Sequence, residues 1–228
     1  MPTIRLEHVA KVYNRSQRGH SATLEVDLRI AQGEFVFIAG NRGSGKSTMA
    51  ELIAGELEPD RGSVWLGGVN LGKAKPWERA WVTSCVGAVL EETELRATET
   101  VFKNLASSRF LEYLKDKYFR KREMGKALSL VGMPDSGTLY ASELTVSECR
   151  RVELARAIWR SPPILVLDGL LERADDDTVW DILHLLSALN SRGTTVVLTV
   201  ADRSYGSILN KRVVTLVEGK VASDIKKN

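Results

Sequence analysis

Residues 40–47 read Gly-Asn-Arg-Gly-Ser-Gly-Lys-Ser and directly follow the apolar run Phe-Val-Phe-Ile-Ala at residues 35–39. This is the pattern G-x-x-x-x-G-K-[ST], placed between a predicted buried strand and a predicted helix at residues 49–56. The glycines let the backbone curl so that successive N–H groups point at phosphate oxygens, and the helix N-terminus adds the positive end of its dipole. The stretch therefore predicts a strand–loop–helix unit that binds nucleotide phosphates.

Three side chains complete such a phosphate site. Lys46 is expected to reach the β- and γ-phosphates, and the Ser47 hydroxyl is expected to bind Mg²⁺. A carboxylate at the end of a neighbouring buried strand is expected to hold the same metal ion through water, and Asp168 after the run Ile-Leu-Val-Leu at residues 164–167 supplies it. The loop residues predicted to hold ATP are Asn41, Arg42, Gly43, Ser44, Gly45, Lys46, Ser47 and Thr48.

The composition is typical of one soluble α/β domain over residues 1–228, with 43% hydrophobic and 27% charged residues. No stretch approaches about 18 consecutive apolar residues, so no membrane-spanning segment is predicted. The first residues, 1–11, have mixed charge and alternate like a strand, unlike a signal peptide. Cys85 and Cys149 have neither metal-ligand spacing nor the density of a disulfide scaffold, which indicates a cytoplasmic protein.

The net charge of +3 is too small to indicate nucleic-acid binding by itself. Basic residues do cluster at 115–122, but acidic residues at 112, 116 and 123 interleave with them. This mixture is typical of a solvated helix face. No nucleic-acid partner is therefore expected.

The order of predicted elements gives the fold. Residues 3–9 and 24–30 alternate apolar and polar side chains and predict half-buried antiparallel strands. Further strands are predicted at 35–39, 63–66, 164–167, 195–199 and 213–217, and helical segments at 49–56, 99–131, 147–159 and 176–189. We therefore predict an α/β fold, a P-loop NTPase core with a parallel sheet. An N-terminal antiparallel β subdomain would form a side sheet, and an α-helical subdomain at approximately 95–155 would be inserted in the core.

Three further stretches resemble one family of such NTPases. Residues 150–158, Arg-Arg-Val-Glu-Leu-Ala-Arg-Ala-Ile, resemble the signature helix of ATP-binding cassette (ABC) ATPases. The segment Lys-Val-Tyr ending at Tyr13 resembles that family's A-loop, whose aromatic ring stacks on adenine; a surface aromatic that packs on the loop is the alternative. Asp175 matches the D-loop aspartate. The resemblance covers nearly the whole chain, and residues 33–37 together with the length are most similar to the FtsE subfamily of cell-division ATPases.

The same resemblance marks departures at hydrolytic positions. The family's catalytic glutamate follows the magnesium aspartate, where this chain has Gly169, and its switch histidine falls at Val200 or Ala201. Neither of those two side chains can donate a hydrogen bond to a γ-phosphate. Glu91 occupies the Q-loop glutamine position and is predicted to contact ATP and Mg²⁺, although residues 91–94 could equally be a solvated acidic loop. No catalytic residue of the family's hydrolytic set is thus intact.

The signature motif, Leu-Ser-Gly-Gly in the family, reads Leu-Thr-Val-Ser at residues 144–147. In the family this motif closes over the γ-phosphate bound by the opposite subunit. Val146 puts a β-branched side chain where the backbone must approach phosphate closely. Thr145 and Glu148 also fit the helix capping box S/T-x-x-E, and we expect that to be their main role. Glu172, close in sequence to Gly169, is expected to belong to the D-loop.

These features predict the ATP-binding subunit of an ABC-type membrane complex, either a transporter or an FtsE-like cell-division system. It would bind Mg-ATP and hydrolyse it weakly or not at all, because binding residues remain while hydrolytic ones are replaced. The resemblance implies a transmembrane partner protein, a second ABC subunit that is identical or catalytically intact, and a peripheral location at the inner face of the cell membrane. The alternative is a soluble regulatory or structural ABC protein, a class that usually carries two cassettes or long coiled-coil insertions. A third class, the P-loop kinases, requires a lid for an acceptor substrate and is disfavoured by the signature-like helix.

Overall fold

The computed structural model describes residues 3–14, 21–90, 95–106, 117–172 and 174–226. Its strands are β1 (Ile4–Asn14), β2 (Ser21–Ile30), β3 (Phe35–Ala39), β4 (Arg61–Leu66), β5 (Val69–Asn70), β6 (Val86–Val89), β7 (Ile164–Leu167), β8 (Thr195–Val200), β9 (Arg212–Val217) and β10 (Lys220–Ile225). Its helices are α1 (Lys46–Ala54), α2 (Pro76–Ser84), α3 (Val101–Ala106), α4 (Lys117–Leu130), α5 (Val146–Ile158), α6 (Asp176–Ser191) and α7 (Ser204–Ile208), with short 3-10 turns at Ser136–Thr138 and Ala141–Glu143.

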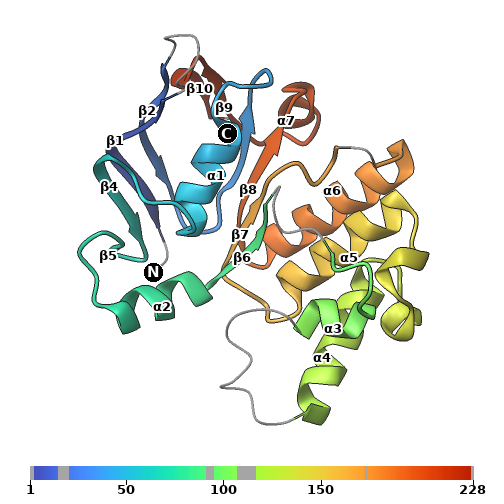
Figure 1. Cartoon of the computed structure of the whole chain (residues 1–228). Helices are drawn as coiled ribbons and strands as arrows, with labels where there is room; N and C mark the ends of the chain where they lie inside the picture. Colours follow the sequence, from blue (N-terminus) through green and yellow to red (C-terminus); the bar gives the residue numbers. More distant parts are fainter. Residues whose placement is uncertain (1–2, 15–20, 91–94, 107–116, 173, 227–228) are drawn as a thin grey trace.

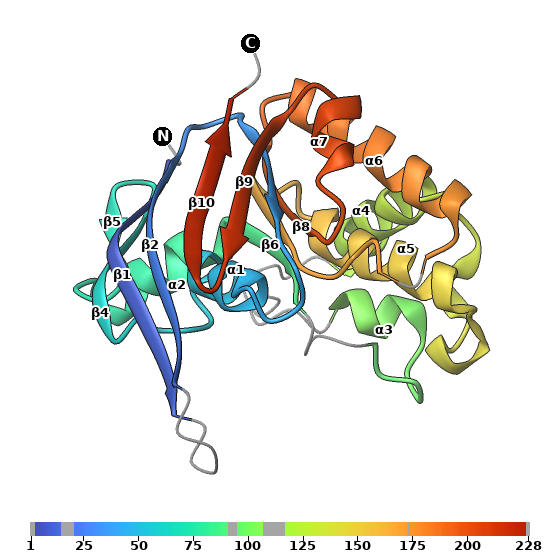
Figure 2. The ribbon, with the colours of Figure 1, turned by 90° about the horizontal axis from the view of Figure 1, so that it is seen from above.

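The strands form one ten-stranded sheet in the order β5-β4-β1-β2-β10-β9-β3-β8-β7-β6 (Figures 1 and 2). Strands β6, β7, β8, β3 and β9 pair in parallel, whereas β1, β2, β4 and β5 pair antiparallel. The α/β P-loop NTPase fold is thus confirmed. The expectation of a separate side sheet is wrong, because β10 pairs with β2 at Lys220 and Glu25 and makes the sheet continuous.

Strand β3 is buried on both faces because helices cover the sheet on both sides. Phe35 and Phe37 lie in the core cluster formed with α3, α4, α5 and α6. Val36 and Ile38 point the other way, into the cluster formed with α1 and the antiparallel strands. Figure 1 shows α3 to α6 gathered on one side of the sheet and α1 on the other. This two-faced burial explains why the strand before the phosphate loop is apolar throughout.

The helices between β6 and β7 are held partly by one buried amide. The predicted helical stretch 99–131 contains α3 and α4, and residues 107–116 between them lie outside the described part. Asn104 is fully buried; its Nδ2 donates to the backbone oxygens of Arg96, Glu99 and Thr100, and its Oδ1 accepts from Arg96 N. This amide therefore fixes the backbone of residues 96–100, which leads into α3.

The basic cluster predicted as a solvated face lies partly in α4. Lys121 and Arg122 are exposed, and Glu123 accepts hydrogen bonds from Arg122 and Lys126. The described part of the cluster therefore agrees with the solvated-face interpretation, while residues 107–116 lie outside it.

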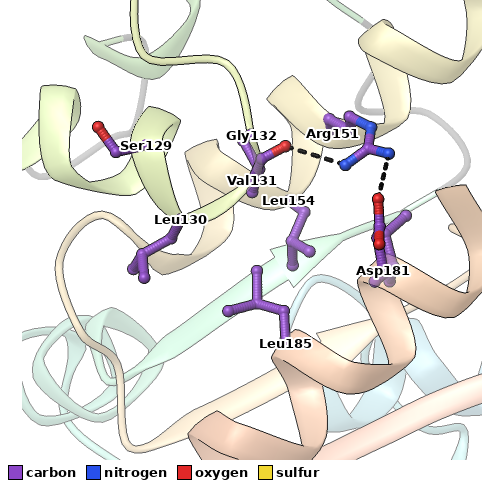
Figure 3. A pocket seen from close by; sticks show the side chains of 9 residues that line it. Ser129, Leu130, Val131, Gly132, Arg151, Leu154, Asp181 and Leu185 are labelled. Atoms are coloured by element: carbon purple, nitrogen blue, oxygen red, sulfur yellow. Dashed lines mark hydrogen bonds and ion pairs between the residues drawn. The ribbon is translucent and has the colours of Figure 1, made fainter.

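Arg151 of the signature-like helix α5 connects α4 with α6 (Figure 3). Its guanidinium donates to Val131 O at 3.1 Å, Thr178 Oγ1 at 3.2 Å and Asp181 Oδ2 at 2.7 Å. A cavity of about 270 Å³ opens beside it, and Leu130, Leu154 and Leu185 are among the residues that line it. The contacts of Arg151 fix the position of α5 relative to the parallel core.

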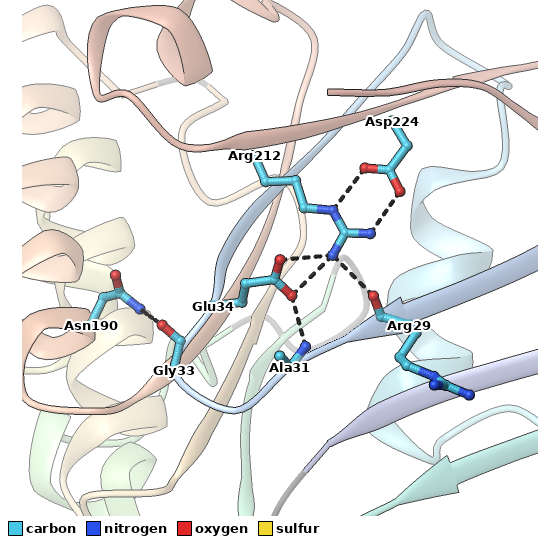
Figure 4. Close-up of polar contacts among 7 residues, drawn as sticks. All are labelled: Arg29, Ala31, Gly33, Glu34, Asn190, Arg212 and Asp224. Carbon is cyan, nitrogen blue, oxygen red and sulfur yellow. Dashed lines mark hydrogen bonds and ion pairs between the residues drawn. The ribbon is translucent and has the colours of Figure 1, made fainter. Parts of the chain in front are cut away.

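Arg212 at the start of β9 holds together several segments in the middle of the sheet (Figure 4). Its guanidinium makes a two-pronged contact with Asp224 of β10, both distances being 2.7 Å. The remaining nitrogen donates to Glu34 at 2.9 Å and to Arg29 O at 2.9 Å. The hydrogen bonds that Arg212 donates to Asp224, followed by the charge of Glu34, raise the pKa of Arg212. One buried cation therefore joins β2, the turn before β3, β9 and β10.

Candidate nucleotide-binding site

The loop between β3 and α1 has a backbone that only glycine accommodates at three positions. Gly43 and Gly45 adopt φ of 81° and 98°, in the left-handed region that side-chain-bearing residues rarely occupy. A Cβ atom at Gly40 would lie 2.4 Å from Ser44 Oγ and 2.6 Å from Leu216 O. The glycines of the motif are thus required by the observed path of the loop, which runs directly into α1.

The loop presents donors suited to phosphate. No side chain caps the N-terminus of α1, so the N–H groups of its first turn remain available to an anion. Lys46 Nζ donates to Gly40 O at 2.8 Å and to Asn41 O at 3.1 Å, and the ammonium therefore lies over the start of the loop. Ser44 Oγ is buried and has no hydrogen-bond partner. An uncapped helix N-terminus, an ammonium and an unpaired buried hydroxyl fit a phosphate chain.

Tyr13 lies beside this loop, a position that fits both adenine stacking and packing of a surface aromatic on the loop. Thr48 Oγ1 donates to Tyr13 Oη at 3.3 Å, which connects the end of β1 with the first turn of α1. The Tyr13 side chain is 38% exposed and so keeps an open surface. Asp60 fixes the strand that carries it, accepting from Val12 N at 2.8 Å and Lys11 Nζ at 2.9 Å. These two hydrogen bonds lower the pKa of Asp60, and the one from Val12 N has the larger effect.

Asp168 lies at the carboxyl end of β7, where it is 6% exposed. Strand β7 is not the direct neighbour of β3, because β8 lies between them. Thr199 of β8 donates its hydroxyl to Asp168 Oδ1 at 2.5 Å and accepts a hydrogen bond from Gly169 N at 3.1 Å. Thr199 was not predicted as a site residue, and a threonine within an otherwise apolar strand was the only signal for it.

No group of three or more His, Cys, Asp or Glu residues capable of holding a metal ion occurs in the described part of the chain. A magnesium ion at a nucleotide typically keeps several waters and takes one or two protein ligands together with phosphate oxygens. Asp168 and Ser47 are the described residues of the predicted metal set, and their chemistry fits that donor set. Glu91, the third predicted ligand, lies outside the described residues.

The position predicted for the family's catalytic glutamate has an unusual backbone. Gly169 adopts φ of 63°, again in the left-handed region. The chain turns there, with Glu172 N donating to Gly169 O at 3.1 Å. The Glu172 carboxyl carbon lies 4.0 Å from the place that a Cβ at residue 169 would take. A carboxyl group is therefore near that position, although it comes from a residue three positions later.

The two predicted positions for the switch histidine differ in burial. Val200 is the last residue of β8 and is 5% exposed, within the core on the side of α3 to α6. Ala201 follows the strand and is exposed. Ala201 is therefore the one whose side chain lies outside the core.

The signature-like segment forms the predicted helix cap. Thr145 is the N-cap of α5: its N–H donates to Glu148 Oε2 at 2.7 Å and its hydroxyl accepts from Glu148 N at 3.3 Å. These contacts confirm the capping box, and the bond from the Thr145 N–H lowers the pKa of Glu148. Val146, next to the cap, is 56% exposed.

Ser147 is engaged by the D-loop aspartate of the same chain. Its hydroxyl donates to Asp175 Oδ2, and Asp175 N donates back to Ser147 Oγ at 3.2 Å. Asp175 Oδ1 also accepts from Thr178 N at 2.8 Å and so caps α6. The hydrogen bond from Ser147, followed by that from Thr178 N, lowers the pKa of Asp175 to about 2. The N-termini of α5 and α6 thus carry an intramolecular link that sequence reasoning did not predict.

A phosphate loop after β3, a buried carboxylate after β7 and an aromatic ring beside the loop define a nucleotide-binding protein of the P-loop class. The carboxyl ends of parallel strands meet at one edge of a sheet, which brings the loop and the carboxylate to the same edge. Residues 150–158, which resemble the ABC signature helix, lie in α5 before β7. The chain belongs to the ABC transporter family, which it matches over residues 24–171.

Several FtsE proteins align with nearly the whole chain. The cell division ATP-binding protein FtsE of Streptococcus pneumoniae (strain D39) is 31% identical over 228 residues, covering 100% of this chain and 97% of that protein. FtsE of Escherichia coli K12 is 31% identical over 216 residues, covering 95% and 96%. FtsE of Mycobacterium tuberculosis is 32% identical over 222 residues, covering 97% and 95%. The similarity to FtsE proteins predicted from the sequence is confirmed.

Solved structures of an ABC cassette share the fold. A dimeric post-hydrolysis state of the ATP-binding cassette MJ0796 bound to ADP and Pi superposes with a TM-score of 0.88 at 26% identity, covering 98% of both chains. Another dimeric structure of MJ0796, described as a bacterial ABC transporter cassette, gives the same TM-score at 27% identity and the same coverage. In the described part of this chain, no helix has both the length and the apolar character needed to cross a membrane.

Proposed function

We propose that this chain binds Mg-ATP as the nucleotide-binding subunit of an ABC-type membrane complex, and that it hydrolyses ATP slowly by itself. The observation that carries the proposal is the loop after β3, whose left-handed Gly43 and Gly45 lead into the uncapped N-terminus of α1. This arrangement is built to bind phosphate. The Tyr13 ring beside it extends the site toward a nucleobase.

Each binding residue then has a role that follows from its chemistry. Lys46 exchanges its contacts with loop carbonyls for the β- and γ-phosphates, and backbone N–H groups of the loop hold the remaining oxygens. Ser47 and Asp168 hold Mg²⁺, which when bound neutralises charge on the phosphate oxygens. The open face of Tyr13 stacks on adenine.

Slow hydrolysis follows from the groups around the γ-phosphate position. Gly169 provides no carboxylate to polarise water, and neither Val200 nor Ala201 provides a hydrogen-bond donor. A general base contributes about 10²–10⁴-fold, and oriented donors add further factors. Since these groups act together, the loss of several leaves little catalysis.

The membrane assignment rests on the relatives. Proteins named as cell division ATP-binding proteins are similar to this chain from end to end. On that similarity we place the chain at the inner face of the cell membrane, with a transmembrane partner and a second ABC subunit that is identical or catalytically intact. No structural observation favours the alternative of a regulatory or structural ABC protein away from membranes.

Calorimetric titration with ATP, with and without Mg²⁺, tests the central claim. Lys46→Ala removes the ammonium and should weaken Mg-ATP binding at least about tenfold, a loss of one strong charge-assisted contact. Lys73→Ala, an exposed lysine between β5 and α2, is the matched control and should bind as the wild type does. Wild-type protein that binds no ATP with Mg²⁺ present would refute the proposal. Co-purification from membranes of the native cell tests the membrane partner separately.

A further inference from the structure

Strand β8 separates the strand that carries the phosphate loop from the strand that carries Asp168. Thr199 lies near its carboxyl end, opposite Ile38 of β3 in the strand pairing. Its side chain reaches the other neighbour, where it contacts Asp168 and Gly169 at the end of β7. The Thr199 side chain of the intervening strand β8 therefore contacts both Asp168, the predicted metal ligand, and Gly169, the position predicted for the catalytic base.

The direction of the Thr199 hydroxyl is determined by its two partners. The N–H of Gly169 donates to Thr199 Oγ1 at 3.1 Å, so the hydroxyl proton is directed at Asp168 Oδ1, 2.5 Å away. Thr199 is 4% exposed and Asp168 6%, so water does not compete freely for either bond. A β-branched side chain in a strand also has restricted χ1 rotation. These constraints orient the Asp168 carboxylate.

The contact distinguishes the two oxygens of Asp168. Oδ1 accepts from Thr199, whereas no described residue donates to Oδ2. We propose that Thr199 is a positioning residue for the metal: by holding Oδ1 it fixes Oδ2 as the oxygen directed to the Mg²⁺ of bound Mg-ATP. The inference rests on the proposed Mg-ATP binding and adds a residue to it. Mg²⁺ requires nearly ideal octahedral geometry, so the orientation of a single carboxylate affects its affinity.

The experiment measures how ATP binding depends on Mg²⁺, by titrating MgCl₂ at fixed ATP and protein and by measuring ATP binding in EDTA. Thr199→Val keeps the shape and removes the hydroxyl. We expect the half-saturating Mg²⁺ concentration to rise about tenfold, as is usual when a group that orients a metal ligand is removed. ATP binding in EDTA should stay unchanged, and Thr199→Ser, which keeps the hydroxyl, should restore the wild-type Mg²⁺ dependence.

Thr195→Val is the matched control. Thr195 lies on the same strand, is fully buried, and accepts a hydrogen bond from Gly33 N at 2.9 Å at the opposite end of β8. The Thr195→Val variant should lower thermal stability as Thr199→Val does, since each variant leaves a backbone N–H without its acceptor. It should leave the Mg²⁺ dependence unchanged. Equal shifts in the two valine variants would mean a structural effect only and would overturn the inference.

Asp168→Asn separates this inference from the function on which it rests. One outcome is that Asp168→Asn raises the half-saturating Mg²⁺ concentration while Thr199→Val leaves it at the wild-type value. In that case the role of Thr199 is refuted and Mg-ATP binding stands. If the wild type binds ATP without any response to Mg²⁺, or does not bind it, both are refuted. The inference is supported if the half-saturating Mg²⁺ concentration rises in Thr199→Val and Asp168→Asn. It must also stay at the wild-type value in Thr195→Val and Thr199→Ser.

Discussion

Gly169 adopts a left-handed conformation with φ of 63°, and this constrains any attempt to repair the site. In the ABC family, a glutamate at this position activates water. A residue with a Cβ in this backbone region is strained by about 1–2 kcal/mol. The open space around the position, with only Glu172 near, does not remove that strain. The backbone at the position predicted for the glutamate thus disfavours a residue with a side chain.

We predict that Gly169→Glu leaves turnover within about tenfold of the wild type, because catalytic groups that act together are strongly non-additive. Gly169→Ala should lower the free energy of unfolding by about 1 kcal/mol through the same backbone strain, and it is the control for strain without charge. Phosphate release and denaturant unfolding measure the two effects. Wild-type turnover of about 1 s⁻¹ or faster, an ordinary enzymatic rate, would contradict the premise.

The sequence predicted residues whose role is encoded in a motif and missed those whose role depends on neighbouring strands. Lys46 was predicted from the motif between a strand and a helix, and Asp168 from its place after an apolar run in a chain that has this motif. Thr199 and Thr195 are both threonines in the same apolar strand, and only the neighbouring strands show that one contacts the metal aspartate and the other a turn. Pairing partners are a property of the sheet, so no local pattern distinguishes them.

At the level of elements, the link between Ser147 and Asp175 joins the starts of α5 and α6. The pKa of Asp175 is lowered to about 2, so the folded state binds its proton less readily than the unfolded chain. The stabilisation is therefore complete above the unfolded pKa, about 3.9, and is lost as pH falls through about 2.

Asp175→Ala should consequently lower the thermal midpoint at pH 7, and the difference from the wild type should shrink as pH falls from about 4 toward 2. Asp176→Ala, in the first turn of the same helix, is the control for removing an acidic residue near the helix N-terminus. Thermal unfolding across this pH range measures both variants. A difference that stays constant down to pH 2 would show that the Asp175 carboxylate does not stabilise the fold.

Two elements were predicted with nearly their observed limits, and two others were missed. The strand at 164–167 was predicted with its observed limits, and the helix predicted at 147–159 begins and ends within one residue of α5. Helix α2 was not predicted, and its apolar pair Trp77 and Trp81, four residues apart, is exposed. Strand β10 was also missed: it is short of buried apolar residues and is held by the Arg212–Asp224 contact.

At the scale of the whole molecule, the contact between Arg212 and Asp224 also explains why the sheet is continuous. Asp224 accepts two hydrogen bonds from Arg212, which raises the pKa of the arginine and lowers that of the aspartate. Lys220 at the other end of β10 pairs with Glu25 of β2. The predicted side sheet lacked this bridging strand, so the sequence suggested two sheets where the fold has one.

Association between two copies is the property most affected by the signature-like segment. In the ABC family this segment closes over the γ-phosphate bound by the opposite subunit, and the similar cassette MJ0796 has been solved as a dimer. Here Val146 is exposed at the start of α5, and Ser147 is already bound to Asp175. Glu148 lies in the first turn of α5, and the Asp175 carboxylate contacts Ser147 of that same turn, so like charge there opposes a γ-phosphate.

We therefore predict that the isolated chain stays mostly monomeric with Mg-ATP at micromolar concentration. Light scattering coupled to size exclusion, with and without Mg-ATP, measures this. The double variant Val146→Gly, Ser147→Gly removes the β-branched side chain and releases Asp175 from the serine, so it should shift the protein toward an ATP-dependent dimer. Asp176→Ala, which leaves the signature-like segment intact, should behave as the wild type. Because the phosphate loop of this chain is intact, an ABC subunit with an intact signature should close over its ATP when the two are mixed. A stable ATP-dependent homodimer of the wild type would contradict the prediction, since it would show that Thr145, Val146 and Ser147 engage phosphate despite their side chains.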